Sequence, residues 1–330
     1  MPRDASTPAG VRAVAAVAPA KINLHLGVGD LRADGFHDLL TVYRAVDLWE
    51  EVTVSFADRD EVTVSGPGAP HVPTDRSNLA ARAVDLLREE AGSDARIAIR
   101  IVKGVPVAGG MAGGSADAAA ALLATDRLLG LGLGRAALEE RAARLGSDVP
   151  FCLRGGTALG TGRGETLATL LRARTEQHLV VALADGGLST PVVFAELDRL
   201  RAERTDLPRA GGTESLVEAL AGDDPLMVAD LLTNDLQPAA LSLMPALRRT
   251  LRAGEEAVGG GVHAPLHERL LLCDYAVVDL SGEGAAAFYQ LGLRDGLRPA
   301  TTVTLVGEAG PLPLAPASPE TIRYALAADG

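Results

Sequence analysis

Apolar and polar side chains alternate strictly in residues 96–102 (RIAIRIV), which predicts a strand with one buried face. Three further stretches are rich in strand-forming residues, at 11–19, 50–55 and 61–65. Apolar residues recur with helical spacing at 77–91, 115–129 and 135–145. Strands and helices mix without a regular strand–helix–strand repeat. We therefore expect an α+β fold rather than a doubly wound sheet.

The pattern changes after about residue 170, and we expect one domain at 1–170 and a second at 171–330. In the second domain we expect strands at 178–184, 275–280 and 301–306, helices at 225–235 and 239–253, a surface loop at 203–215 and an extended proline-rich tail at 309–320. A chain of 330 residues is long enough for two modest domains, each with a buried core.

Charge and cysteine content narrow the class of protein. The net charge of −12 argues against a nucleic-acid surface, which needs clustered lysine and arginine, but not against a small anionic ligand. No apolar run is long enough for a membrane span, and the N-terminus does not resemble a signal peptide. Cys152 and Cys273 lack metal-binding spacing and are expected to be free thiols. We expect a cytoplasmic protein without membrane or nucleic-acid partners.

The stretch 105-VPVAGGMAGGSADAAAALLA-124 combines a glycine-rich loop with a helix. Ser115 is placed to cap the helix, and Asp117 to complement its positive end. The glycines would let backbone N–H groups approach an anion closely, as at other helix N-termini. A capped tight turn explains the same residues equally well. The spacing fits neither GxxxxGK[ST] nor GxGxxG, so two common nucleotide loops are excluded.

This loop lies between two other motifs, 17-VAPAKINLHLGVGDLRADGFHDLLTV-42 and 144-RLGSDVPFCLRGGTALGTGRGE-165. The three segments, in this order, resemble the GHMP family of small-molecule kinases. PAKINLHL is similar to the first motif of that family, and PVAGGMAGGSADAAAAL to its phosphate loop. The ADGFH, LGSDVPFCL and GGTALGTGRGE stretches resemble the branch that phosphorylates 4-diphosphocytidyl-2-C-methyl-D-erythritol.

The resemblance implies transfer of the γ-phosphoryl group of ATP, with Mg²⁺, to the 2-hydroxyl of that cytidyl diphosphate substrate in isoprenoid precursor synthesis. It also implies an N-terminal α/β domain and a C-terminal ferredoxin-like domain, in a monomer or a homodimer. Two alternatives stay open. One is another GHMP kinase, of the homoserine or mevalonate type, and the other is a catalytically impaired paralogue that binds nucleotide. The ADGFH stretch favours the cytidyl substrate over the first alternative.

The resemblance assigns the catalytic roles to Lys21 and Asp148. Asp148 would accept or orient the proton of the substrate hydroxyl. Lys21 would pair with Asp148 and stabilise the negative charge of the transferred group. On residue types alone, Asp148 belongs to a helix stop between Gly146 and Pro150, and Lys21 is a solvated strand residue.

Phosphate binding is assigned to one continuous loop. Its residues are Pro106, Val107, Ala108, Gly109, Gly110, Met111, Ala112, Gly113, Gly114 and Ser115. The Ser115 hydroxyl is also the candidate ligand for Mg²⁺. Asp117 is expected to have a structural capping role, because a carboxylate beside phosphate is unfavourable. Lys103 is expected to be a solvated charge, or alternatively to face the nucleotide.

For the substrate, the resemblance implies that the base stacks on Phe36 and bonds to His37, and that Asn23 contacts the polyol. Phe36 stands where the family more often has tyrosine. The phenyl ring keeps the stacking surface and lacks only the hydroxyl. The run that holds Gly160, Gly162 and Gly164 is expected to line the cleft.

The third glycine motif of the family, roughly GxxGSGPT, is missing from its expected place after LRAGEEAVGGG. Residues 281–284 (SGEG) are a shifted candidate, although Glu283 would repel a triphosphate. The alternative is that the motif is lost and SGEG is an ordinary turn.

Overall fold

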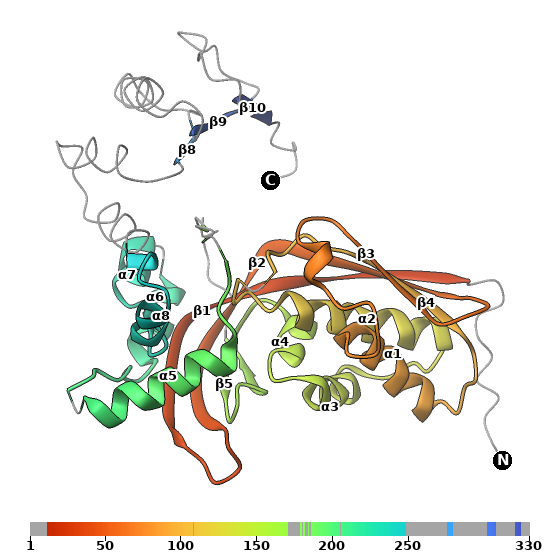
Figure 1. Ribbon diagram of the computed structural model, residues 1–330, viewed down its shortest axis with the longest axis horizontal. Helices are drawn as coiled ribbons and strands as arrows, with labels where there is room; N and C mark the ends of the chain where they lie inside the picture. The colour runs from red at the N-terminus through yellow and green to blue at the C-terminus, as the bar shows by residue number, and fades with distance from the viewer. Residues whose placement is uncertain are drawn as a thin grey trace. The chain divides into compact units, whose positions relative to one another are not determined.

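A long antiparallel hairpin organises the first part of the chain (Figure 1). Its strands are β1 (Ala13–Leu31) and β2 (His37–Phe56), paired from Ala13 opposite Ser55 to Leu31 opposite His37. The tight turn between them contains Gly35, whose φ of 80° suits glycine. Strands were expected at 11–19 and 50–55, and both extend much further than their local pattern indicates. The PAKINLHL motif therefore lies inside a strand.

The computed structural model describes residues 12–107, 109–170, 179, 181, 184, 186–204, 206–222, 224–248, 276–279, 302–307 and 321–324. The chain forms two compact units, Met1–Met244 and Pro245–Gly330. The domain boundary at residues 170 and 171 remains a prediction. No helix among the described residues is long and apolar enough to cross a membrane.

The hairpin belongs to a sheet with the strand order β3-β4-β2-β1-β7, in which β5 also pairs with β2, and β6 pairs with β5. The other strands are β3 (Glu61–Ser65), β4 (Ile97–Val102), β5 (Thr157–Thr161), β6 (Thr166–Thr169) and β7 (Thr233–Asn234). β4 and β5 pair with different halves of β2, at Glu51–Phe56 and Thr41–Arg44. Because β2 is long, it connects the part of the sheet that contains β4 with the part that contains β5.

Four helices pack with one half of the sheet (Figure 1). They are α1 (Leu79–Glu90), α2 (Gly113–Leu129), α3 (Arg135–Leu145) and α4 (Val149–Arg154), and the short 3₁₀ helix η1 (Ala69–His71) precedes them. The Asn78 side chain caps α1 by accepting from Ala80 and Ala81. The many alanines of α2 have small side chains, so neighbouring elements pack closely around the helix. It is buried on nearly all sides, and the central core of the unit forms around it.

A second group of helices packs against the other half of the hairpin, as the left of Figure 1 shows. It contains α5 (Thr190–Glu203), α6 (Glu214–Ala221), α7 (Pro225–Asp230) and α8 (Gln237–Leu243). Leu24 and Val42 pack with α6, while Leu26 and Val28 pack with α5 and α8. Residues after 170 therefore share a core with the first two strands.

The described part of the second unit includes three short strands, β8 (Ala276–Asp279), β9 (Thr302–Gly307) and β10 (Thr321–Tyr324). They form a parallel sheet with the order β10-β9-β8. β8 and β9 agree with the strands expected at 275–280 and 301–306. The candidate glycine motif at 281–284 and the tail at 309–320 lie outside the described residues.

Some expectations were wrong in their bounds or in kind. The helix expected at 225–235 ends at Asp230, because the next residues turn into β7 and pair with β1. The helix expected at 239–253 begins at Gln237 and ends at Leu243, within the residues described there. Most of the strand expected at 178–184 lies outside the described residues.

Candidate active site

Lys21 and Asp148 come together, as the resemblance to the GHMP kinases implies. The Nζ atom of Lys21 lies 3.6 Å from the Oδ2 atom of Asp148. Lys21 projects from β1, and Asp148 immediately precedes α4. The lysine side chain is 9% exposed and the aspartate side chain 31%, so the carboxylate is the partner that a substrate can reach. Lys21 is therefore not the solvated strand residue that its type alone indicated.

Two further side chains hold this pair in place. Lys21 donates a 2.8 Å hydrogen bond to Asn23 Oδ1, and Asn23 donates a 2.7 Å bond to the Thr41 hydroxyl on β2. The buried Tyr43 hydroxyl donates to Asp148 Oδ1 at 3.1 Å. Burial, and then the charge of Asp148, raise the pKa of Tyr43 far above its usual value, so the hydroxyl stays a donor. Thr41 and Tyr43 were not predicted, and their two-residue spacing on β2 is the only sequence signal.

Irregularities in the pairing of β1 set the direction of the side chains in the PAKINLHL motif. The register with β2 shifts between Pro19 and Ala20 and again between Asn23 and His25, on either side of Lys21. Such shifts rotate side chains out of the regular alternation of a strand. The backbone N–H of Lys21 donates to the Met111 carbonyl at 3.1 Å. The strand that holds Lys21 and the glycine loop are therefore connected directly.

The predicted phosphate loop leads into the N-terminus of α2, which begins at Gly113. Gly110 and Ala112 have positive φ values of 71° and 60°, so the loop turns sharply just before the helix. The cap residue is Ala112, and no side chain bonds the first N–H groups. The expected Ser115 cap is therefore wrong. Ala108 lies outside the described residues. The uncapped donors and the positive helix end suit an anion.

Beneath this loop, Lys103 forms a buried cluster with two carboxylates. Its Nζ atom lies 2.6 Å from Glu50 Oε1 and 2.6 Å from Asp117 Oδ2. Glu50 also accepts the Gly104 N–H at 3.0 Å. All three side chains are at most 2% exposed, so Lys103 is neither solvated nor turned toward a nucleotide. Asp117 binds Lys103 instead of capping α2.

Glu50 was missed by the analysis of the sequence. It shares the inward face of β2 with Val52 and Val54, so the alternation along the strand contained the signal. Burial, and then the charge of Asp117, raise the pKa of Glu50 to about 7. Two carboxylates beside one ammonium make the cluster a natural place to hold a proton.

Phe36 and His37 lie at the end of the β1–β2 turn, in different surroundings. Phe36 is 50% exposed, and the Arg163 guanidinium lies 4.9 Å from its ring centroid. His37 is buried, with Nδ1 at 3.0 Å from the Gly29 carbonyl oxygen and Nε2 at 3.3 Å from Asp198. The Phe194 ring stacks on His37 at 5.2 Å between centroids. Phe194 and Asp198 were not predicted, because nothing local relates α5 to the ADGFH turn.

The GGTALGTGRGE run forms β5 and the turn into β6. The Leu39 N–H donates to the Gly162 carbonyl at 2.7 Å, which places this turn beside the start of β2. A Cβ atom at Gly164 would collide with the Tyr43 hydroxyl. The glycine therefore leaves room for the tyrosine that bonds Asp148.

No group of three or more histidine, cysteine or acidic residues among the described residues is placed to hold a metal ion. Mg²⁺ bound with a nucleotide takes most of its ligands from phosphate and water, with one or two from the protein. The partly exposed Asp148 carboxylate and the half-buried Ser115 hydroxyl are oxygen donors of the kind that this ion prefers. The residues present therefore fit Mg²⁺ bound together with a nucleotide.

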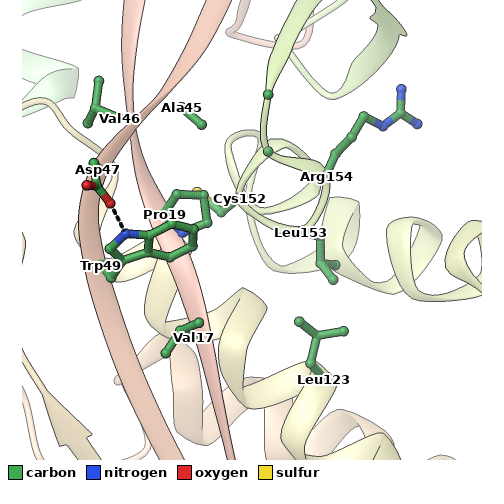
Figure 2. A pocket seen from close by; sticks show the side chains of 12 residues that line it. Val17, Pro19, Ala45, Val46, Asp47, Trp49, Leu123, Cys152, Leu153 and Arg154 are labelled. Carbon is green, nitrogen blue, oxygen red and sulfur yellow. Dashed lines mark hydrogen bonds between the residues drawn. The ribbon is translucent and has the colours of Figure 1, made fainter. Parts of the chain in front are cut away.

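A mostly apolar pocket of about 420 Å³ lies elsewhere, between the hairpin and α4 (Figure 2). Its walls include Val17, Pro19, Trp49 and Cys152, and the indole of Trp49 donates to Asp47. None of the residues expected to act in catalysis or to bind phosphate or substrate lines it. The candidate active site is instead the region around Lys21, Asp148 and the start of α2.

Known proteins match the chain over most of its length. A family model described as the GHMP kinases N terminal domain matches residues 78–156. A 4-diphosphocytidyl-2-C-methyl-D-erythritol kinase from Nocardia farcinica is 54% identical over 277 residues, covering 82% of this chain and 90% of the relative. A kinase of the same name from Mycolicibacterium gilvum is 59% identical over 241 residues, covering 72% of this chain and 74% of the relative.

A solved structure agrees with these relatives. The crystal structure of a 4-(cytidine 5'-diphospho)-2C-methyl-D-erythritol kinase superposes with a TM-score of 0.52 and 31% sequence identity. The superposition covers 73% of this chain and 83% of the other.

Proposed function

The chain belongs to the 4-diphosphocytidyl-2-C-methyl-D-erythritol kinase family, and we propose that it phosphorylates the 2-hydroxyl of that cytidyl substrate with ATP. Membership rests on the Nocardia farcinica relative, 54% identical with 90% of its length covered. The same matches confirm the resemblance to the GHMP kinases that the sequence motifs indicated, and they confirm the α+β GHMP kinase fold. The proposed product is an isoprenoid precursor, and the cytoplasm is the proposed location.

The Lys21–Asp148 pair carries the proposal for catalysis. In the reaction, a bond forms between the substrate 2-oxygen and the γ-phosphorus, and the bond from that phosphorus to the β,γ-bridging oxygen breaks. Asp148 orients the hydroxyl and takes its proton, and ADP leaves. Phosphoryl transfer depends mainly on positioning and on charge stabilisation, because its transition state is loose. The Tyr43 hydrogen bond supports this role by fixing the carboxylate.

Lys21 supplies positive charge beside the reacting groups. Its ammonium lies between Asn23 and Asp148, and its own backbone N–H bonds the phosphate loop. A cation fixed in advance costs no reorganisation when the negative charge shifts in the transition state. Asn23 is turned toward Lys21 and Thr41, so its proposed contact with the polyol would use the face that these bonds leave free.

Phosphate binding is proposed for the loop at 106–115. Support comes from the N–H groups of α2, which no side chain caps, and from the turn geometry at Gly110 and Ala112. The Ser115 hydroxyl would contribute to holding Mg²⁺, which would screen phosphate charge. The buried Lys103 cluster would support the loop from below.

Base recognition is proposed for the ADGFH turn together with α5. Phe36 offers an exposed ring, and His37 lies against Phe194. A pyrimidine ring needs an aromatic face and donors or acceptors at its edge, and this corner contains both.

Two features of the active site disfavour the alternatives. A homoserine or mevalonate kinase would have no use for an aromatic corner at the ADGFH turn. An impaired paralogue would be expected to lose Lys21 or Asp148, and both are present and paired. Residues 281–284, the shifted candidate for the third glycine motif, lie outside the described residues.

The proposal is tested by measuring ADP release with purified protein, ATP and Mg²⁺. Three acceptors are compared, namely the cytidyl substrate, homoserine and mevalonate. We expect turnover with the cytidyl substrate only. Preference for either other acceptor, or no turnover by the folded protein, would refute the proposal.

A further inference from the structure

Three side chains on one face of α5 reach the β1–β2 hairpin. Phe194, Asp198 and Arg201 follow each other at helical spacing, so they project from the same side of the helix. Phe194 stacks on His37, and Asp198 contacts the Nε2 atom of that ring. Arg201 donates to the carbonyl oxygens of Val28 and Gly29 at 2.8 and 3.2 Å. The helix therefore sets the surroundings of His37.

Both ring nitrogens of His37 face acceptors. Nδ1 lies 3.0 Å from the Gly29 carbonyl oxygen, and Nε2 lies 3.3 Å from Asp198 Oδ2. A carbonyl oxygen cannot donate, and neither can a carboxylate. The carbonyl thus favours hydrogen on Nδ1, and the carboxylate favours hydrogen on Nε2. Asp198 therefore favours a ring that can donate from Nε2 to a ligand.

Asp198 itself is accessible and lightly held. Its side chain is 37% exposed, while that of His37 is 5% exposed. Within the described part of the chain, His37 is the only group that Asp198 bonds. The carboxylate can therefore move aside from Nε2 without breaking another interaction in this part of the chain.

We propose that Asp198 is a specificity-determining residue that selects cytosine over uracil at this corner, an inference that rests on the proposed function. The Nε2–H of His37 and the carboxylate of Asp198 form a donor beside an acceptor. Cytosine presents the complementary edge, an N3 acceptor beside an N4 amino donor. Uracil presents N3–H and O4, which places donor against donor and oxygen against carboxylate.

In this arrangement the carboxylate beside the proposed base-recognition histidine has a function of its own. In the free protein the carboxylate lies 3.3 Å from Nε2, on the side of the ring where the base would bind. When the base is bound, Nε2–H turns to N3 and the carboxylate accepts the N4 amino group. A site built around hydrogen bonds rejects an analogue that leaves its polar groups unpaired.

The test uses the full-length protein and measures dissociation constants for CDP and UDP by calorimetry. We expect the wild type to bind CDP roughly 10- to 100-fold more tightly than UDP, as matched edge contacts predict. Asp198→Asn should reduce that ratio to within about threefold, because an amide can donate as well as accept. Asp198→Glu should restore part of the preference. Glu203→Gln, which removes an exposed carboxylate from the same helix, should leave it unchanged.

Two results would overturn the inference in different ways. If the wild type turns over the cytidyl substrate and Asp198→Asn keeps the full preference for CDP, Asp198 is not the determinant and the proposed function stands. If the folded wild type neither turns over that substrate nor binds CDP, the proposed function fails and the inference fails with it.

Discussion

The ammonium of Lys21 and the carboxylate of Asp148 lie 3.6 Å apart, although one belongs to the first strand and the other to the residue before α4. Packing creates this relationship, because α4 is held against the core that β1 and α2 share. Tyr43 and Asn23 then fix each partner by a hydrogen bond of its own. The pair is the feature from which the proposed chemistry follows.

Tyr43→Phe should lower kcat by about tenfold, because Asp148 loses a donor in a largely buried site. The phenyl ring keeps its packing against Phe151, so the fold should be retained. Steady-state kinetics and circular dichroism check the two expectations together. An unchanged kcat in the folded variant would show that the hydroxyl does not position the carboxylate.

Gly113→Ala should weaken ATP binding and lower the melting temperature. Its Cβ atom would lie 2.9 Å from Glu50 Oε1 and 3.4 Å from Lys103 Nζ, both of which are buried. Overpacking of this kind costs about 1–3 kcal/mol and would displace the start of α2. Gly134→Ala is the matched control, because it lies at the start of α3 with open space around it. Equal effects of the two changes on ATP binding would contradict the proposal that the loop before α2 binds phosphate.

Glu50→Gln should alter how stability depends on pH. Burial raises the pKa of Glu50 from 4.5 to about 7, so the folded state holds the proton more tightly than the unfolded state. The contribution of this proton is therefore fully present below pH 4.5 and is lost as the pH rises through 7. Glutamine mimics the protonated side chain and does not titrate.

Urea unfolding at pH 5 and pH 7.5 measures this contribution. Between these values, the wild type should lose about 2 kcal/mol relative to Glu50→Gln. Glu51→Gln, on the exposed face of the same strand, should follow the wild type. A constant difference between wild type and Glu50→Gln at both pH values would contradict the buried cluster.

Short elements with a clear period were predictable from the sequence. The strand at 61–65 and the helix at 135–145 have the predicted bounds, because their patterns end at turn residues. The lengths of β1 and β2 were not predictable, since long-range pairing extends strands beyond their local propensity. The segment after 230 became a strand for the same reason, through its pairing with His25 and Leu26.

The candidate site was predictable only in part. The glycine loop and the two proposed catalytic residues belong to recognisable sequence motifs. Glu50, Phe194 and Asp198 do not, because each acts through a partner that is distant in sequence. Lys103 was expected to be solvated for the same reason, because its two buried carboxylate partners are distant in sequence.

The most direct test of the central claim compares wild type and Asp148→Asn in phosphate transfer from ATP to the cytidyl substrate. We predict turnover by the wild type and a loss of roughly 10²- to 10⁴-fold in kcat for the variant, with both ligands still bound. Wild-type rates in Asp148→Asn, or no transfer by the folded wild type, would contradict the account.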